Sequence, residues 1–154
     1  MNQNTALSNT FATDGENTFQ PGTAPLVLIV DDHEPSQTVL RMIAHQFGLT
    51  PIVADTAQDA IRELNESQNG FDILLMDFLL GADNGLAVAA TLHTLANASG
   101  KTALMHTLLV TGATDQVTRD NPSWVAAEVA GILPKPISAK MLFGHLEPFH
   151  HHIK

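Results

Sequence analysis

Short apolar runs alternate with longer amphipathic segments over most of the chain. A continuous apolar run is typical of a strand buried on both faces of a sheet, whereas apolar residues three and four positions apart are typical of a helix. These patterns predict strands at residues 25–32, 51–55, 71–77, 103–111 and 131–134. They predict helices at residues 34–48, 56–67, 83–100, 123–131 and 138–152. The chain therefore repeats a strand–helix unit five times.

This alternation predicts an α/β fold, a doubly wound five-stranded parallel sheet with helices on both faces. With the strand order 2-1-3-4-5, counted along the chain, the first and third strands are neighbours. No internal repeat and no second domain is visible in the sequence. Residues 1–24, rich in Asn, Thr, Gly and Ala, are predicted to be a flexible tail, and residues 25–154 are predicted to be the domain.

The same spacing assigns helix faces and helix ends. In the helix at 34–48, the expected buried face consists of Val39, Met42, Ile43, Gln46 and Phe47. Asp83 or Asn84 is expected to cap the third helix, and Ser123 the fourth. Pro148 is expected to disturb the end of the last helix.

Composition excludes several classes of function. The formal net charge is -9, and the seven Lys and Arg residues are scattered singly, so we expect no nucleic-acid binding. The chain has no cysteine, which excludes disulfides and thiolate metal sites and fits a cytoplasmic location. No apolar run approaches the roughly 20 residues that span a bilayer, and residues 1–24 do not resemble a secretory signal.

Polar residues stand at the carboxyl ends of four predicted strands. The first strand ends in Asp31 and Asp32, the third in Asp77 and the fourth in Thr111, while Lys135 follows the fifth. In open parallel α/β sheets, ligands bind outside these ends, where the strand order reverses. We therefore expect the acidic pair to face Asp77, with Thr111 and Lys135 on the other flank.

This expected cluster has the composition of a site that receives a phosphoryl group. Three carboxylates in a partly dry cleft repel one another and need a cation, and hard oxygen ligands suit Mg²⁺. Lys135 adds a positive charge, and Thr111 adds a hydroxyl donor. The Asp77 carboxylate can act as a nucleophile and form an aspartyl phosphate, while the metal and the lysine neutralise the shifting charge.

Plainer interpretations of the same residues remain open. Asp31 or Asp32 can cap the helix that follows, because Asp is a favoured N-cap residue. Lys135 can be an ordinary surface lysine, and Thr111 can be present only because threonine favours strands. The positions of all of them at strand ends favour the functional interpretation.

Five motifs together are similar to a known family. "LIVDD" ends the first strand, "LLMD" ends the third, Asp83-Asn84-Gly85 follows Asp77, "LLVTG" ends the fourth strand and "LPKP" follows the fifth. In this order and spacing, residues 25–150 resemble a response-regulator receiver domain of the CheY-like kind, used in two-component signalling. The resemblance implies the flavodoxin-like strand order given above.

The resemblance also implies roles for individual residues. Asp77 would be the phosphoacceptor, with Lys135 pairing with it or with its phosphate, and Thr111 would hydrogen-bond a phosphoryl oxygen. Mg²⁺ would be held by Asp77, Asp31, Asp32 and the backbone carbonyl of Leu79. The Lys135-Pro136 peptide bond is often cis in this family.

The sequence also departs from the family pattern. The aromatic residue that is common three positions before the lysine is Ile132 here, so the usual aromatic rotamer switch cannot operate. Leu80 and Gly81 replace the common Met-Pro pair, and Gly81 predicts a freer backbone. Leu79 and Ala113, beside the approach to the phosphoryl group, offer no base to orient water, which predicts slow dephosphorylation.

The eight histidines invite other assignments. His150, His151 and His152 resemble a short metal-binding tract, but a polar C-terminal tail is the preferred interpretation. His93 is expected to be a surface or half-buried helix residue rather than a phosphotransfer histidine. His33 either lines the acidic site or simply begins the following helix.

These observations predict a stand-alone receiver that accepts a phosphoryl group from a phosphohistidine onto Asp77 with Mg²⁺. Expected partners are a sensor histidine kinase or a histidine phosphotransfer protein and a downstream protein target, with no nucleic acid and no membrane. The domain is expected to catalyse only the transfer of a phosphoryl group to its own Asp77, and otherwise not to be an enzyme. It is expected to be a monomer, or a dimer that forms on phosphorylation. The alternative is an interaction module that keeps the fold without phosphorylation. An aspartyl hydrolase is set aside because it needs a second Asp at position 79, which is Leu.

Overall fold

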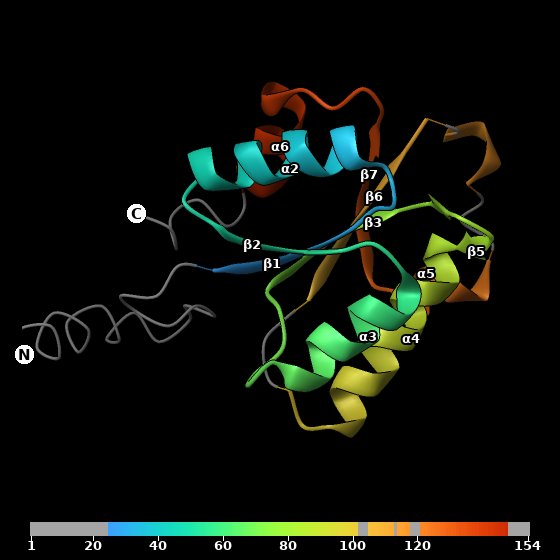
Figure 1. Cartoon of the computed structure of the whole chain (residues 1–154). Helices are drawn as coiled ribbons and strands as arrows, with labels where there is room; N and C mark the ends of the chain where they lie inside the picture. Colours follow the sequence, from blue (N-terminus) through green and yellow to red (C-terminus); the bar gives the residue numbers. More distant parts are fainter. Residues whose placement is uncertain (1–24, 102–104, 113, 118–120, 148–154) are drawn as a thin grey trace, which may run out of the picture.

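A computed structural model describes residues 25–101, 105–112, 114–117 and 121–147 of the chain (Figure 1). Its centre is a five-stranded parallel sheet in the order β2-β1-β3-β6-β7. The predicted order 2-1-3-4-5 is confirmed, because these are the first to fifth long strands along the chain. The strands are β1 (Leu26–Val30), β2 (Thr50–Ala54), β3 (Ile73–Asp77), β6 (His106–Thr111) and β7 (Val129–Pro134).

Helices cover both faces of the sheet (Figure 1). One face carries α2 (Glu34–Gln46) and α6 (Ala139–Leu146), and the other carries α3 (Ala57–Glu66), α4 (Gly85–Ala98) and α5 (Pro122–Ala126). A 3₁₀ turn, Thr114–Gln116, follows β6. A small antiparallel pair, β4 (Leu79–Leu80) and β5 (Asp83–Asn84), lies between β3 and α4.

The central strands are apolar throughout because both of their faces are covered. Every residue of β3 is buried, and only Leu26 of β1 is partly exposed. Successive side chains point to opposite faces, so each strand contributes to two separate cores. Leu28, Leu74 and Leu109 pack towards α3 and α4, whereas their neighbours along the strands pack towards α2 and α6.

Side-chain caps define where the helices begin. Asn84 accepts hydrogen bonds from the backbone nitrogens of Leu86 at 2.8 Å and Ala87 at 3.3 Å, so Asn84 rather than Asp83 caps α4. Thr56 caps α3 and Ser138 caps α6 in the same way. A cap removes one unpaired backbone donor and stabilises a helix by about 1 kcal/mol.

The predicted buried face of α2 is partly wrong. The buried residues of this helix are Gln37, Leu40, Ile43 and Ala44. Met42 is 54% exposed and Val39 is 39% exposed, so only part of the expected stripe faces the core. Apolar residues lie on two neighbouring stripes of α2, and contact with β1 and β2 selects between them.

The predictions for the fourth helix and the fifth strand are also wrong in their boundaries. Asn121 caps α5 by accepting a hydrogen bond from the Ser123 nitrogen at 2.9 Å, and proline occupies the first helical position, where it is favoured. The helix ends after five residues, and Glu128 adopts a positive φ of 52° that reverses the chain. β7 therefore begins at Val129, two residues earlier than predicted.

Several predictions concern residues outside the described part of the chain. These are the flexible tail at residues 1–24, the role of Ala113, the effect of Pro148 and the polar tract His150–His152. None of the described helices is long and apolar enough to cross a membrane.

Candidate functional site

The register of the sheet brings the predicted site residues to one edge. Val30 of β1 lies opposite Met76 of β3, so the following residues, Asp31 and Asp77, are level with each other. On the other side of β3, Asp77 lies opposite Val110, which places Thr111 one residue further along β6. The backbone nitrogen of Lys135 donates to the Thr111 carbonyl oxygen at 2.9 Å, which joins the end of β7 to the end of β6.

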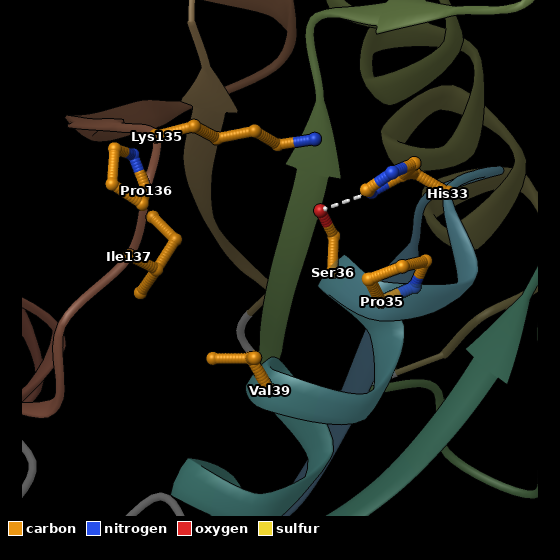
Figure 2. A pocket seen from close by; sticks show the side chains of 7 residues that line it. All are labelled: His33, Pro35, Ser36, Val39, Lys135, Pro136 and Ile137. Atoms are coloured by element: carbon orange, nitrogen blue, oxygen red, sulfur yellow. Dashed lines mark hydrogen bonds between the residues drawn. The ribbon is translucent and has the colours of Figure 1, made fainter.

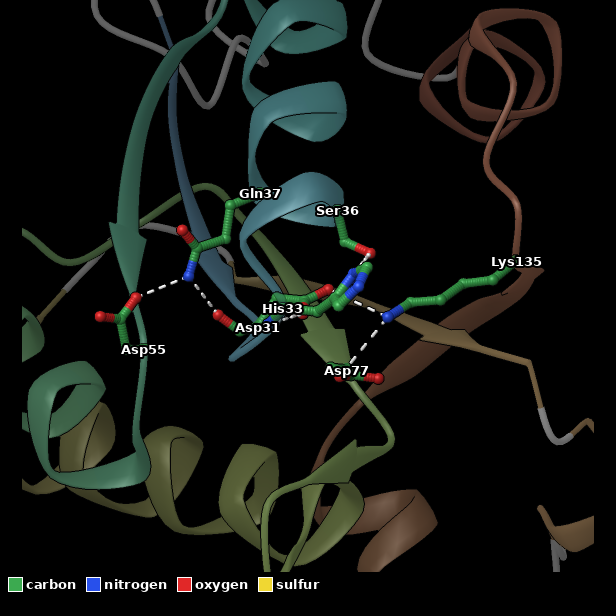
Figure 3. A network of polar contacts seen from close by, with 7 residues as sticks. All are labelled: Asp31, His33, Ser36, Gln37, Asp55, Asp77 and Lys135. Atoms are coloured by element: carbon green, nitrogen blue, oxygen red, sulfur yellow. Dashed lines mark hydrogen bonds and ion pairs between the residues drawn. The ribbon is translucent and has the colours of Figure 1, made fainter.

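Lys135 links two buried carboxylates at this edge (Figure 3). Its Nζ atom lies 3.2 Å from Asp31 Oδ2 and 3.5 Å from Asp77 Oδ2. Asp31 is 1% exposed and Asp77 is 6% exposed, so both carboxylates are largely removed from water. The lysine therefore compensates charges that would be costly to bury alone.

The pKa of Asp77 is nevertheless raised above its ordinary value. Burial raises its pKa to about 6, and the negative charges of Asp31 and Asp32 act in the same direction, while Lys135 opposes them. The carboxylate of Asp77 thus carries more negative charge around it than the lysine alone balances. A further cation at this position would stabilise its ionised form.

The donor set fits a hard divalent cation such as Mg²⁺. Carboxylate oxygens of Asp31, Asp32 and Asp77 all lie within 4.8 Å of one another. Asp32 is exposed, whereas the other two are buried, so the group is open to solvent on one side. Mg²⁺ in proteins is held by one or two carboxylates and keeps several waters, which matches an acidic cluster with an open side.

The segment after Asp77 forms a small ribbon that the sequence does not predict. Leu79 of β4 lies opposite Asn84 of β5, Leu80 lies opposite Asp83, and Gly81 is in the turn between them. The expected freer backbone at Gly81 stays a prediction. Gly81 has a φ of +59°, and a Cβ added to it would lie 3.7 Å from Asp32 Oδ2. Leu79 is 51% exposed at the edge of the site.

Gly85 brings the start of α4 against the back of Asp77. Its nitrogen donates to the Phe78 carbonyl oxygen at 2.6 Å. A Cβ at this position would lie 1.9 Å from the Asp77 carbonyl oxygen, so no side chain fits. The glycine of the Asp83-Asn84-Gly85 motif is therefore explained by close contact of two backbones behind the acidic site.

Thr111 and Ile132 occupy the positions that the resemblance assigns to them. Thr111 is 1% exposed at the end of β6, next to the residue opposite Asp77. Ile132 is half-buried in β7 and packs against the core beneath α3 and α4. The Lys135-Pro136 bond is cis, as the resemblance implies.

A cavity of about 560 Å³ opens beside Lys135 (Figure 2). It lies between the start of α2 and the β7–α6 connection, and its lining residues are His33, Pro35, Ser36, Val39, Lys135, Pro136 and Ile137. Nδ1 of His33 lies 2.9 Å from Ser36 Oγ. Of the two assignments considered for His33, the structure shows the start of the helix, because His33 is the N-cap residue of α2. The cavity that it lines includes none of the three carboxylates.

One alternative left open by the sequence is decided here, and one expectation is wrong. The plainer interpretation of Asp31 as the cap of α2 does not hold, because its Oδ1 accepts from the His33 nitrogen at 2.8 Å and His33 is the N-cap residue. His93 is 5% exposed and therefore buried, with Nε2 2.9 Å from Thr107 Oγ1 and Nδ1 3.3 Å from Glu128 Oε2. Burial lowers the pKa of His93. Its contacts are with Thr107 of β6 and with Glu128 after α5, so its role is structural and it is not part of the acidic site.

One polar residue at the site had no signal in the sequence. Gln37 donates from Nε2 to the Asp31 carbonyl oxygen and to Asp55 Oδ1, each at 2.6 Å. A glutamine inside an amphipathic helix is usually assigned to the exposed face. Only the packing of α2 against β1 and β2 shows that it is buried here.

The comparisons with known proteins agree with this geometry. Residues 27–147 match the family model of the response regulator receiver domain. The chain belongs to this family. The chain has no significant match among curated proteins, so the family assignment rests on the family model.

Solved receiver domains share the fold of this receiver. A CheY-like receiver from Methanospirillum hungatei JF-1 is 20% identical, with a TM-score of 0.67, and the match covers 85% of this chain and 97% of that one. A signal receiver domain of a modulated diguanylate cyclase from Desulfovibrio desulfuricans G20 is 26% identical, with a TM-score of 0.65 and coverage of 85% and 97%.

A third solved structure contains a metal. It is the receiver domain of a sensor histidine kinase from Pseudomonas aeruginosa PAO1 with a magnesium ion coordinated in the active-site cleft. It is 20% identical to this receiver, with a TM-score of 0.65, and the match covers 84% of this chain and 99% of that one.

Proposed function

We propose that this receiver accepts a phosphoryl group from a phosphohistidine onto Asp77 in a Mg²⁺-dependent reaction, and passes the signal on by binding another protein. The observation that carries the proposal is the contact of one lysine with two buried carboxylates, beside a third acid that is open to solvent. A structural ion pair needs one carboxylate, whereas three around one lysine leave a net negative site that favours a bound cation.

The residues act in the following way in this proposal. An oxygen of ionised Asp77 attacks the phosphorus atom, the P–N bond to the donor imidazole breaks, and its electron pair stays on the imidazole nitrogen. Lys135, already within 3.5 Å of Asp77 Oδ2, binds a phosphoryl oxygen as the carboxylate oxygen becomes part of the acyl phosphate. Thr111 would donate a hydrogen bond from its hydroxyl to another phosphoryl oxygen.

The acidic cluster provides the ligands for the cation. Asp32 and Asp77 would hold Mg²⁺ through their carboxylates, Asp31 would contribute through its remaining acceptor capacity or through water, and Leu79 through its backbone carbonyl. When bound, Mg²⁺ supplies neutralisation of the phosphoryl oxygens during transfer. The receiver of the Pseudomonas aeruginosa kinase, which has a magnesium ion in its cleft, supports this assignment.

We propose a sensor histidine kinase or a histidine phosphotransfer protein as the phosphodonor. A related solved structure is a Saccharomyces cerevisiae histidine phosphotransfer protein in complex with the receiver domain of its downstream response regulator, and that receiver is 19% identical to this one. The cavity beside Lys135 has apolar walls from Val39, Pro136 and Ile137. A donor that docks there would deliver its histidine next to Asp77.

The proposal is tested by incubating the protein with acetyl phosphate and Mg²⁺ and measuring its mass. We expect a gain of one phosphoryl group that requires Mg²⁺ and is absent in Asp77→Asn. Asp59 is partly exposed on α3, is ion-paired with Arg62 and is not one of the three clustered carboxylates, so Asp59→Asn is a matched control and should phosphorylate normally.

The alternative function is an interaction module that needs no phosphorylation. Ile132, at the position where the family commonly has an aromatic switch residue, is the observation in its favour. Absence of any mass gain with acetyl phosphate or a phosphorylated histidine donor would support this alternative. A pull-down with and without beryllofluoride then identifies the protein target and shows whether its binding depends on the phosphorylated state.

A further inference from the structure

Gln37 is a buried polar residue to which phosphoryl transfer assigns no role. It is 8% exposed, in the first turns of α2, and its side chain reaches the acidic edge (Figure 3). Nε2 donates to the carbonyl oxygen of Asp31, after β1, and to Oδ1 of Asp55, after β2, each at 2.6 Å. One amide nitrogen thus uses both of its protons on oxygens from two different strand ends.

With this bond, every polar atom of Asp31 has a partner. Its nitrogen donates to the Ala54 oxygen at 3.1 Å, and its Oδ1 accepts from the His33 nitrogen at 2.8 Å. Its Oδ2 accepts from Lys135, and its carbonyl oxygen accepts from Gln37. The Asp31 carbonyl lies beyond the end of β1. Gln37 supplies the hydrogen-bond donor that a backbone nitrogen of a neighbouring strand supplies within the sheet.

The same bond orients the next residue. The carbonyl of Asp31 and the nitrogen of Asp32 belong to one planar peptide unit, so fixing the carbonyl fixes the direction in which Asp32 leaves the strand. Within the described residues, the Asp32 carboxylate has no hydrogen bond and no ion pair that would hold it. Its position is therefore set by its backbone, and Gln37 restrains that backbone.

We propose that Gln37 is a positioning residue of the acidic site, which holds the Asp31–Asp32 peptide so that the Asp32 carboxylate is directed towards a divalent cation. The inference rests on the proposed function, because it concerns the same Mg²⁺ site. Glutamine suits the task since its neutral amide donates two protons without adding charge. A glutamate would set a carboxylate oxygen against the oxygens of Asp31 and Asp55, and a lysine would repel the cation.

The test compares Gln37→Met with the unaltered protein, using Mg²⁺ alone as the probe. Methionine has a similar length and no donor, so the peptide loses its restraint while the volume is kept. We expect calorimetry to show Mg²⁺ binding weakened by about tenfold, the lower end of the loss seen when a residue supporting a ligand is removed. Asp55→Asn, which keeps an acceptor oxygen for the Gln37 amide, should change the affinity by about twofold or less.

A second measurement separates positioning from mere stability. Bound Mg²⁺ raises the free energy of unfolding by an amount that depends on its concentration and affinity. In a positioning role, Gln37→Met reduces this Mg²⁺-dependent increment. Equal destabilisation with and without Mg²⁺, together with an unchanged affinity, would overturn the proposal.

If Gln37→Met does not fold, the unaltered protein still provides the answer. The side-chain amide signals of Gln37 in an NMR spectrum should shift during a Mg²⁺ titration and saturate together with the backbone amide of Asp32. Side-chain signals that stay unmoved while Asp32 responds overturn the inference and leave the proposed function intact. Absence of any Mg²⁺ binding by the unaltered protein overturns both.

Discussion

Replacing Gly85 by alanine tests whether backbone contact behind Asp77 holds the phosphoacceptor in place. The added Cβ would lie 1.9 Å from the Asp77 carbonyl oxygen, 2.8 Å from its carbonyl carbon and 3.0 Å from Phe78 Cα. All three neighbours are backbone atoms, so no side-chain rotation relieves the overlap. Contacts under 3.0 Å are essentially absent for Cβ atoms, so the backbones of α4 and β3 must separate by about 1 Å.

Two costs follow from that separation. Overpacking of this kind costs about 1 to 3 kcal/mol, and loss of the hydrogen bond from the Gly85 nitrogen to Phe78 adds about 1 kcal/mol. The lower entropy of the unfolded chain with alanine offsets about 0.4 to 1 kcal/mol. We expect a net loss of about 1 to 3.5 kcal/mol in the free energy of unfolding. A shift of about 1 Å at the nucleophile is expected to slow phosphorylation by about 100-fold.

Urea unfolding and the rate of phosphorylation by acetyl phosphate measure the two effects. The matched control is Gly144→Ala in α6, where an added Cβ meets no atom within 4 Å. Because glycine inside a helix is unfavourable, this control should gain about 0.5 to 1 kcal/mol and phosphorylate normally. A Gly85→Ala variant that is as stable and as reactive as the unaltered protein would refute the reasoning.

Three further predictions concern charge and the lifetime of the phosphoryl group. In metal-free buffer, Lys135→Met should raise the pKa of Asp77 above about 6, because Lys135 is the group that lowers it; an NMR titration that finds no rise contradicts this. Burial raises the pKa of Asp72 from 3.8 to about 6. The protonated form of Asp72 is therefore favoured by folding, and its contribution to the free energy of unfolding is complete below pH 3.8 and is lost as the pH rises through 6. Asp72→Asn should therefore be more stable than the unaltered protein at pH 7 by roughly 1 to 2 kcal/mol after solvent screening, and equal stability by urea unfolding would oppose the assignment. Leu79→Asn should shorten the phosphoryl half-life by on the order of tenfold because a polar side chain can orient the attacking water, and an unchanged decay of the phosphorylated mass would exclude this.

Lys135 shows how far the sequence alone determines the site. The strands are continuous apolar runs because both sheet faces are covered, and parallel strands place all their carboxyl ends at one edge. From those two facts, Lys135, Asp31 and Asp77 are expected together, and the structure brings them to 3.2 and 3.5 Å. Strand order and strand ends are readable because they depend on long, unambiguous patterns.

Gln37 shows what the sequence does not determine. The helix at 34–46 has two neighbouring apolar stripes, and helical spacing fits either of them. The expected stripe includes Val39 and Met42, which are exposed in the structure. Leu40 and Ala44 on the neighbouring stripe are buried instead, and Gln37 lies with them, where it donates to oxygens of Asp31 and Asp55. A hydrogen bond between residues distant in sequence leaves no periodic signal.

The connections depend still more on tertiary structure. The contact between Gly85 and the Asp77 backbone, the β4–β5 ribbon and the early start of β7 after Glu128 each follow from how one element meets another. The sequence by itself determined which residues form strands and which reactive groups end them, because burial on both faces imposes a pattern along the chain. Only the tertiary structure decided which helix face is buried and how the acidic residues are held, because those depend on short contacts between segments that the chain brings together.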